Sequence, residues 1–149
     1  RLSDLNCALG SSQIKRLNYI SQQRDNLARI YDKIFKTNNN IIIPKRFQEK
    51  KSAYHLYNIR IKFKNLRITK NSFYKILKNK YKINLQVHYT PTYKFDVFKK
   101  FVVNQNSFEN CEKYFKETFS LPLYLQLKKN DIIYIANKIL KLVKKYSKI

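Results

Sequence analysis

The sequence predicts an α/β fold of the α+β kind, in which a long N-terminal helix leads into a small sheet with helices packed on one face. Three observations predict it. Apolar residues recur every three or four positions over the first 36 residues, residues 53–63 alternate between apolar and polar, and helical spacing returns over 129–146. A chain of 149 residues that is 44% hydrophobic and 15% aromatic suits one domain with a buried core.

The first expected element is one long amphipathic helix over about 4–36. Ser3 can cap it, and Asp4 places an acidic residue in its first turn. The run Thr37-Asn38-Asn39-Asn40 is expected to stop it, before a short apolar run at 41–43 and a charged loop at 45–51. The apolar stripe, which slips in places, consists of Leu2, Leu5, Leu9, Ile14, Leu17, Ile20, Leu27, Ile30 and Ile34.

Residues 53–63 are predicted to form a half-buried strand. His55 falls in the apolar set of this strand, so we interpret it as a core histidine. The set expected to face the core is Ala53, His55, Tyr57, Ile59, Ile61 and Phe63. The set expected to face outward is Tyr54, Leu56, Asn58, Arg60 and Lys62.

A helix and a second strand are expected next. Thr69 can cap a helix over about 70–80, whose buried side would carry Phe73, Ile76 and Leu77. In the strand, Gln86 and His88 share the polar face, and Pro91 holds Thr90 extended. The apolar face of the strand would consist of Leu85, Val87 and Tyr89.

The remaining elements are predicted to be helical. A turn or short helix is expected over 94–101, and Ser107 is expected to open a helix that Leu121-Pro122 ends. The stripe of that helix would be Phe108, Cys111, Phe115 and Phe119, which makes Cys111 a core residue. The last helix, about 129–146, would turn inward Ile132, Ile135, Ile139, Val143 and Tyr146.

The cysteines and the first residue of the chain indicate where the protein is located and whether the sequence is a piece of a longer one. Cys7 and Cys111 lie far apart without metal-ligand spacing, so we expect buried free thiols, no zinc site and a cytoplasmic location. Apolar runs reach about five residues, against roughly 20 needed to cross a bilayer. The chain begins with Arg1 and has no methionine, so we expect a piece of a longer protein.

The net charge of +23 raises the alternative of a basic module that binds nucleic acid or anionic surfaces. However, 25 of the 32 basic residues are lysine, and they are scattered along the chain among 16 asparagines and 17 isoleucines. That mixture is typical of AT-rich codons, and nucleic-acid readers favour arginine for bidentate contacts. We therefore do not expect nucleic acid as a partner.

No catalytic device can be assembled from this chain by motif alone. A single glycine excludes most phosphate-binding loops, and the few acidic residues show no paired spacing. His88 stands apart, because it lies on the polar side of a strand end just before a loop, where side chains are often delivered to ligands. Its position favours a binding role.

Several stretches of the sequence match the motifs of one known family. Arg1-Leu2-Ser3-Asp4, Ala8-Leu9-Gly10 and Gln13-Ile14-Lys15 resemble motifs at the start of the C-terminal part of the DegT/StrS-type sugar aminotransferases. The similarity continues through "SAYHLYNIRI" (52–61), "QVHYTPTYK" (86–94), "NCEKYFKETFSLPLY" (110–124) and the final helix, so it covers nearly the whole chain. The "QVHY-x-P-x-Y" form is most similar to the branch that makes UDP-linked 4-amino sugars of the pseudaminic acid pathway.

The resemblance implies the C-terminal domain of a fold-type-I transferase that uses pyridoxal 5'-phosphate. Residues 1–36 would be the interdomain helix, and 37–149 a small domain with a mainly antiparallel sheet. The cofactor and its Schiff-base lysine would belong mainly to a large N-terminal domain outside this chain. The full-length protein would be a cytoplasmic homodimer that moves an amino group, usually from glutamate, to a UDP-linked 4-keto-6-deoxy sugar for surface glycans. Some relatives instead carry out sugar dehydration or regulation, which remains an alternative.

The resemblance also implies substrate-binding residues. His88 would offer a hydrogen bond or charge to the substrate, Tyr89 and Tyr93 a stacking face and a hydroxyl, and Arg1 a contact to an anion. No catalytic residue and no metal ligand is expected in this chain. Relatives often carry His-Pro where Phe95-Asp96 stand here, so the sequence does not support a second histidine contact. Relatives also carry glycines in place of residues 81–84, so we expect the turn before the strand to differ.

Overall fold

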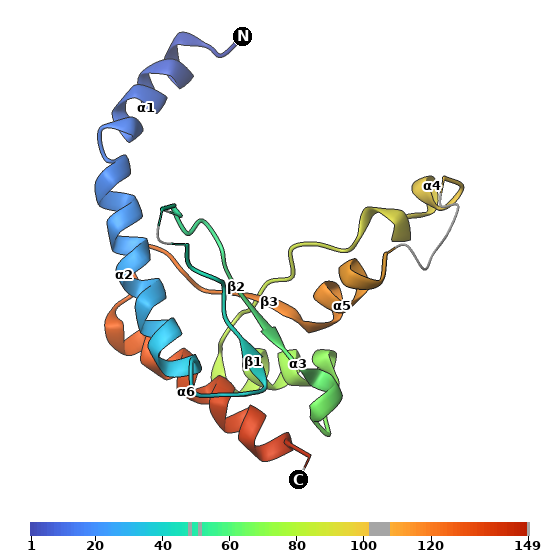
Figure 1. Cartoon of the computed structure of the whole chain (residues 1–149). Coiled ribbons are helices and arrows are strands. Elements are labelled where there is room, and N and C mark those ends of the chain that lie inside the picture. Colours follow the sequence, from blue (N-terminus) through green and yellow to red (C-terminus); the bar gives the residue numbers. More distant parts are fainter. Residues whose placement is uncertain (48, 51, 102–107, 149) are drawn as a thin grey trace.

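A small antiparallel sheet forms the centre of the protein. The computed structural model describes residues 1–47, 49–50, 52–101 and 108–148. Strands β1 (Ile41–Ile42), β2 (Tyr57–Ile61) and β3 (Thr118–Leu121) pair in the order β1-β2-β3, with both pairs antiparallel. Helices α2 (Leu17–Phe35) and α6 (Lys129–Tyr146) pack against each other beside this sheet, and α3 (Lys70–Tyr81) packs on α6 (Figure 1). The predicted fold class is confirmed.

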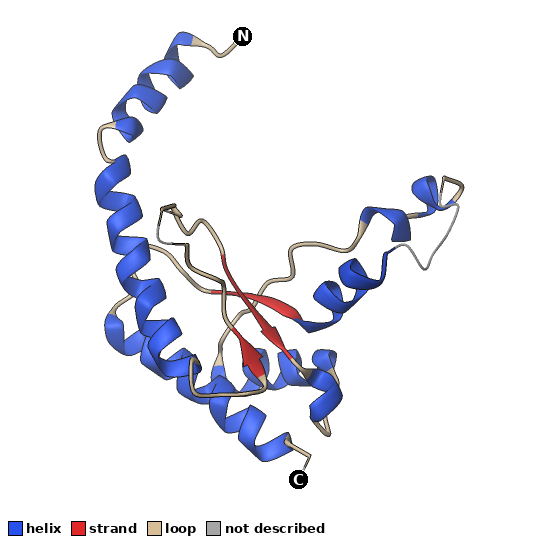
Figure 2. Cartoon of the chain, in the orientation of Figure 1, coloured by secondary structure: helices blue, strands red, loops and turns tan. Residues whose placement is uncertain are grey.

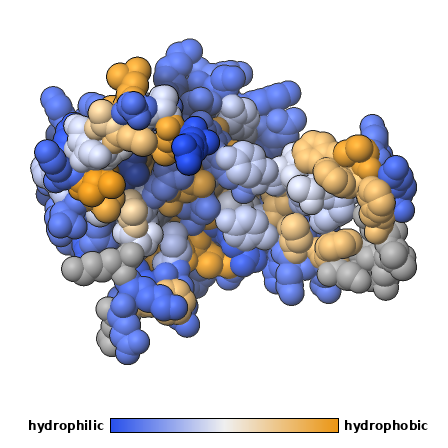
Figure 3. Space-filling model, turned by 90° about the horizontal axis from the view of Figure 1, so that it is seen from above, coloured by the Kyte–Doolittle hydropathy of each residue, from blue (hydrophilic) through white to orange (hydrophobic). Residues whose placement is uncertain are grey.

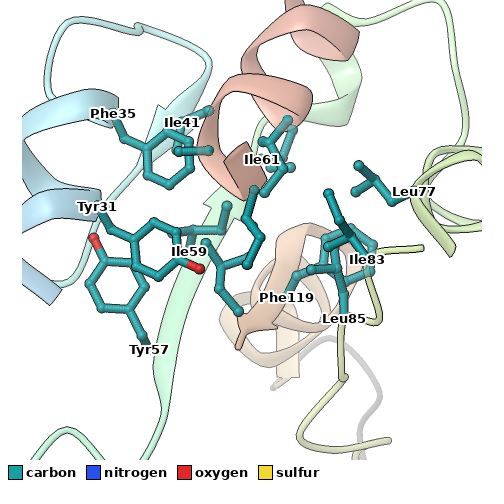
Figure 4. Close-up of a cluster of buried hydrophobic side chains, with 14 of the residues drawn as sticks. Tyr31, Phe35, Ile41, Tyr57, Ile59, Ile61, Leu77, Ile83, Leu85 and Phe119 are labelled. Carbon is teal, nitrogen blue, oxygen red and sulfur yellow. The ribbon is translucent and has the colours of Figure 1, made fainter. Parts of the chain in front are cut away.

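The core fills the space between the sheet and these helices. Figure 4 shows Tyr31 and Phe35 of α2 facing Ile59 and Ile61 of β2, with Phe119 of β3 beside them. All five side chains are buried almost completely. Truncating a buried aromatic side chain such as that of Phe119 to alanine typically costs about 3–5 kcal/mol. This packing therefore holds the sheet against the helices.

The predicted single helix over 4–36 is wrong, because the chain breaks into α1 (Asp4–Ile14) and α2. The apolar stripe slips by five positions between Leu9 and Ile14, so the two halves cannot face the same side of one helix. Every residue of α1 is exposed, whereas α2 buries Leu27 and three further side chains. Figure 1 shows α1 extending away from the sheet toward the N-terminus.

The strand predicted over 53–63 is shorter than expected. Tyr54 adopts a left-handed backbone with φ of 44° and is buried, and its ring lies under the Arg46 guanidinium at 4.8 Å. This turn breaks the alternation, since a strand needs extended backbone at every residue. His55 is exposed as a result, so its assignment to the core is wrong.

The strand predicted over 85–89 reduces to a single bridge between Gln86 and Ser120. Leu85 is 2% exposed as expected, but Val87 is 37% exposed and Tyr89 is 76% exposed. The chain leaves the sheet after Gln86 and runs toward Pro91, so it has no further pairing partner among the described residues. The assignment of Tyr89 to a buried face is wrong.

The later helices follow the predictions more closely. Thr69 caps α3 by accepting a hydrogen bond from the Ser72 backbone, and α6 has the predicted bounds. The predicted turn or short helix near 94–101 is confirmed as a 3-10 turn, η2 (Thr92–Lys94), followed by α4 (Asp96–Lys99). A second 3-10 turn, η1 (Phe63–Asn65), follows β2.

The helix predicted to run from Ser107 to 121 is α5 (Glu109–Glu117), which ends where β3 begins. Ser107 lies outside the described residues. Phe119 belongs to the strand, since the β-favouring run Thr118-Phe119 pairs with β2. Cys111 and Cys7 are free but exposed, so the prediction that they are buried is wrong.

An arm projects from the sheet on the side away from α1 and α2. It carries η2, α4 and α5 (Figure 2). Seen from above, apolar residues gather on this projection (Figure 3). They include exposed Phe95, Val97, Phe98 and Phe101.

Candidate functional site

A cavity of about 830 Å³ opens beside the end of β3 and contains both histidines of the chain. Its walls come from α2, from the segments before β2 and after α3, from β3 with the chain that follows it, and from α6. The lining residues include Arg24, His55, Gln86, His88, Ser120 and Tyr124. The site therefore draws polar side chains from distant parts of the sequence to one place.

His88 reaches this cavity because Gln86 is tied to the sheet. The Gln86 backbone exchanges two hydrogen bonds with Ser120, at 3.1 and 2.8 Å. Side chains two positions apart point to the same side of an extended chain, so His88 follows Gln86 into the cavity. Leu85 and Val87 line a different pocket on the other side. The predicted separation of Gln86 and His88 from Leu85 and Val87 is confirmed.

A chain of polar groups lies behind the His88 ring. His88 Nδ1 lies 2.7 Å from Ser120 Oγ, which donates to Asn58 Oδ1 at 2.5 Å. Asn58 Nδ2 in turn donates to the Tyr114 hydroxyl at 3.3 Å. Asn58 and Ser120 are direct partners across β2 and β3, so the sheet itself sets this spacing.

Tyr89 follows His88 but does not share its surroundings. Its ring packs edge-on against the His88 ring with centroids 4.8 Å apart, and the peptide bond between the two residues is cis. The Tyr89 side chain is 76% exposed. An exposed aromatic face beside a histidine is suited to stacking on a ligand.

Tyr93 lies in the arm and is held by its own neighbours. Its hydroxyl donates to Glu112 Oε1 at 2.6 Å, and its ring stacks on Phe108 with centroids 4.4 Å apart. Desolvation and the hydrogen bond to Glu112 both raise the pKa of Tyr93 above its ordinary value. Hydrogen bonds from Lys94 and Tyr93 lower the pKa of the Glu112 carboxyl. Tyr93 is not among the residues that line the His88 cavity.

Arg1 lies exposed ahead of α1, outside the lining of the His88 cavity. Of the four predicted contacts, only His88 lines this cavity; Tyr89 packs against the His88 ring, and Arg1 and Tyr93 lie elsewhere.

Sequence reasoning missed Arg24, Ser120 and Asn58. Arg24 lines the cavity, and its buried Nε has no hydrogen-bond partner among the described residues. Asn58 was assigned to the polar face of a strand, which could have suggested a cross-strand partner. The position of β3 was not predicted, so nothing in the sequence paired Ser120 with it.

A separate cavity of about 610 Å³ lies on the other side of the 85–88 segment and holds Lys70 among aromatic rings. The Lys70 ammonium lies 5.0 Å from the ring centroids of both Phe115 and Phe119 and donates to the Phe115 carbonyl. Burial lowers the pKa of Lys70 to about 8. This is a half-buried amine in an apolar setting.

The described residues do not form a pyridoxal phosphate site by themselves. Such a site needs a lysine close to groups that hold the phosphate and the ring nitrogen. Lys70 lies across the 85–88 segment from Arg24 and His88, and the lysine that lines the His88 cavity, Lys82, is an exposed residue at the end of α3.

Two further kinds of feature are not found in the described part of the chain. No group of three or more potential metal ligands occurs there. None of its helices is long and apolar enough to cross a membrane.

Known proteins resemble this chain over almost its whole length. It is 32% identical over 148 residues to a UDP-4-amino-4,6-dideoxy-N-acetyl-beta-L-altrosamine transaminase of Campylobacter jejuni. The matched region covers 99% of this chain and 39% of that protein. The spore coat polysaccharide biosynthesis protein SpsC of Bacillus subtilis is 30% identical over 142 residues, covering 95% of this chain and 36% of that protein. This chain thus spans about two fifths of the length of these relatives.

The fold agrees with these sequence similarities. The structure of Helicobacter pylori PseC, an aminotransferase involved in the biosynthesis of pseudoaminic acid, superposes with a TM-score of 0.85. The match has 30% identity and covers 98% of this chain and 38% of that chain. Residues 1–140 match the DegT/DnrJ/EryC1/StrS aminotransferase family. The chain therefore belongs to the DegT/DnrJ/EryC1/StrS aminotransferase family.

Proposed function

We propose that this chain is the C-terminal part of an aminotransferase that moves an amino group, from glutamate, to a UDP-linked 4-keto-6-deoxy sugar during surface-glycan synthesis. The observation that carries the proposal is the match to the Campylobacter transaminase over 99% of this chain. The superposition on Helicobacter pylori PseC over 98% of the chain also supports it.

In this proposal His88 and Tyr89 meet the sugar at the mouth of the cavity. The support is geometric: His88 has one ring nitrogen bound to Ser120 and lines the cavity, while Tyr89 presents an exposed ring beside it. Tyr93 contributes its ring and the lone pairs of its hydroxyl oxygen, since Glu112 holds the hydroxyl hydrogen. Arg1 contacts an anionic group of the substrate, in its own or a second subunit.

The longer protein that we propose would bind pyridoxal phosphate mainly through a domain outside this chain, which would also supply the Schiff-base lysine. The cofactor serves as the electron sink for the amino group, and the protein supplies orientation and charge. We propose a cytoplasmic homodimer. The exposed apolar stripe of α1, which includes Leu5, Leu9 and Ile14, supports packing against further protein.

The test is amino transfer by the longer protein and by two histidine variants. With glutamate and a UDP-4-keto-6-deoxy sugar, the wild type should form the 4-amino sugar, detected by mass spectrometry. His88→Ala should lower turnover by roughly 30- to 1000-fold, the usual loss when one contact to the reacting complex is removed. His55→Ala is the matched control, because His55 lies in the same cavity but is exposed, and it should retain most of the activity.

Two results would contradict the proposal. Conversion of the sugar without incorporation of nitrogen would assign the protein to dehydration. Full turnover by His88→Ala, together with a lowered melting temperature, would make the His-Tyr pair structural.

A further inference from the structure

We propose that Ser120 and Asn58 are positioning residues that hold His88 with its hydrogen on Nδ1, so that Nε2 accepts a hydrogen bond from a hydroxyl or amino group of the ligand. The ligand part of this inference rests on the proposed function. The tautomer part rests only on the polar chain behind the ring. Neither position was expected to act at the site.

The number of hydrogens shared by Asn58, Ser120 and His88 fixes the direction of each hydrogen bond between them. The serine hydroxyl has a single hydrogen, and Ser120 gives it to Asn58 Oδ1 at 2.5 Å. The contact of 2.7 Å between Ser120 Oγ and His88 Nδ1 must then be donated by the ring. A neutral imidazole has one N–H, so Nε2 is left with its lone pair.

The sheet holds this arrangement in place before any ligand arrives. Ser120 is 3% exposed and lies directly opposite Asn58 in the antiparallel pair. Its backbone is tied to Gln86, two residues before His88. On the far side, Asn58 meets the Tyr114 hydroxyl of α5. A residue set in this way adds no reorganisation cost when the ligand binds.

The free nitrogen selects the kind of group that it can contact. His88 Nε2 has no hydrogen-bond partner among the described residues, and the ring lines the cavity. A lone pair attracts the O–H of a sugar or the N–H of an amino group and disfavours a carboxylate or phosphate oxygen. Anionic groups of the ligand would be expected at Arg24 instead, whose buried Nε also lacks a partner in the described part of the chain.

The tautomer can be read directly by NMR on the 149-residue chain with ¹⁵N-labelled histidine rings. The chain has two histidines, so a His55→Asn variant assigns both signals. At a pH where the rings are neutral, we expect a pyrrole-like Nδ1 and a pyridine-like Nε2 for His88. Exposed His55 serves as the internal reference for an unconstrained ring.

Two variants separate the positioning role from the fold. In Asn58→Asp, position 58 can only accept, so Ser120 must keep donating to it and the His88 signals should keep their pattern. In Ser120→Ala, the His88 signals should move toward the tautomer mixture of His55. A pyridine-like Nδ1 in the wild type, a reversal in Asn58→Asp, or an unchanged pattern in a folded Ser120→Ala would each overturn the inference.

Kinetics on the longer protein give the functional readout. We expect Ser120→Ala to lose roughly ten- to a hundredfold in kcat/KM, as is typical when an outer hydrogen-bond partner is removed. Full activity in Ser120→Ala would overturn the positioning role. An inactive wild type would overturn the proposed function alone, because the NMR result decides the tautomer whatever the substrate.

Discussion

The chemical properties of single residues in this protein, such as pKa and hydrogen bonding, depend on their surroundings more than on their residue type. Lys70 is one of 25 lysines, yet its ammonium lies among aromatic rings and burial lowers its pKa to about 8. His55 and His88 line the same cavity, but a hydrogen bond to Ser120 orders only the second. The same residue type therefore serves different purposes at different positions.

Lys70→Met tests the cost of this buried amine. The pKa of Lys70 is near 8 in the fold and 10.5 in the unfolded chain, so the unfolded state binds more protons between these values. The contribution of Lys70 to stability therefore rises as pH increases from about 8 to 10.5. The free energy of unfolding of Lys70→Met relative to the wild type should fall over that range, as measured by denaturant titration.

Lys78→Met, on the exposed side of the same helix, is the matched control for Lys70→Met. It should change stability by less than about 0.5 kcal/mol at every pH. A difference between Lys70→Met and the wild type that does not vary with pH would show that the Lys70 pKa is ordinary.

The elements divide into those that hold the core and those that reach out from it. The loop after β1 is tied to α2 by Arg46, which donates to Asp25 and Asp32 at 2.5 Å. Tyr57 of β2 adds a hydrogen bond to Asp32 at 2.6 Å. This group joins loop, helix and strand at one end of the core.

Arg46→Met should destabilise the chain in a pH-dependent way. Burial alone would raise the pKa of Asp25, but hydrogen bonds from Arg46 and Arg29 hold it below its ordinary value of 3.8. A carboxyl with a lowered pKa stabilises the fold above its unfolded pKa, and that contribution disappears as pH falls through the folded value. The variant should lose about 1–3 kcal/mol at pH 7 and progressively less below pH 4.

Arg29→Met is the control for this group, since Arg29 is 65% exposed and binds Asp25 from one turn away. An exposed pair of this kind is worth about 0.5 kcal/mol or less. Equal losses in the two variants, measured by urea unfolding at pH 7, would argue against a special role for Arg46.

Removal of α1 should leave the remaining fold intact. No side chain of α1 is buried, so deletion of residues 1–15 is expected to change the free energy of unfolding by about 0.5 kcal/mol or less. Ile139→Ala in α6, a fully buried position, should cost about 2–5 kcal/mol in the same assay. A large loss on deletion would mean that α1 packs against the core in solution.

The sequence predicted elements well where local signals agree with packing. Thr69 and the spacing of Phe73 and Leu77 placed α3, and the uninterrupted stripe of α6 placed its bounds. Errors arose where a tertiary contact decides the backbone. Tyr54 takes a left-handed conformation under Arg46, and Phe119 leaves the helical pattern to pair with β2.

The site was predictable only in part for the same reason. His88 could be singled out because its neighbours in sequence show which face it occupies. Ser120 and Asn58 lie 62 positions apart, and only the pairing of β2 and β3 makes them neighbours. The hydrogen-bond chain behind the ring is a property of the sheet, which a linear pattern does not contain.

The whole molecule has the form of a small core with two extensions, α1 on one side and the arm of α4 and α5 on the other (Figure 1). Both extensions expose large apolar side chains, such as Leu5 and Phe101. In the longer protein that we propose, further protein would cover such surfaces.

We expect the isolated chain to bind pyridoxal phosphate without specificity. Lys82, the lysine that lines the His88 cavity, is exposed at the end of α3, and the 25 lysines of the chain offer imine formation at many sites. Titration followed by absorbance and mass spectrometry should give heterogeneous adducts that do not saturate. A saturable one-to-one complex would contradict this expectation.

Because α1 does not pack on the core, substitutions at its apolar positions should have different effects in the isolated chain and in the longer protein that we propose. In the isolated chain, Leu5→Gln or Leu9→Gln should be silent, because folding does not use either side chain. In the longer protein that we propose, the same changes should impair assembly. A residue-by-residue comparison of tolerance in the two settings would therefore map the surface that covers α1, without a structure of the assembled enzyme.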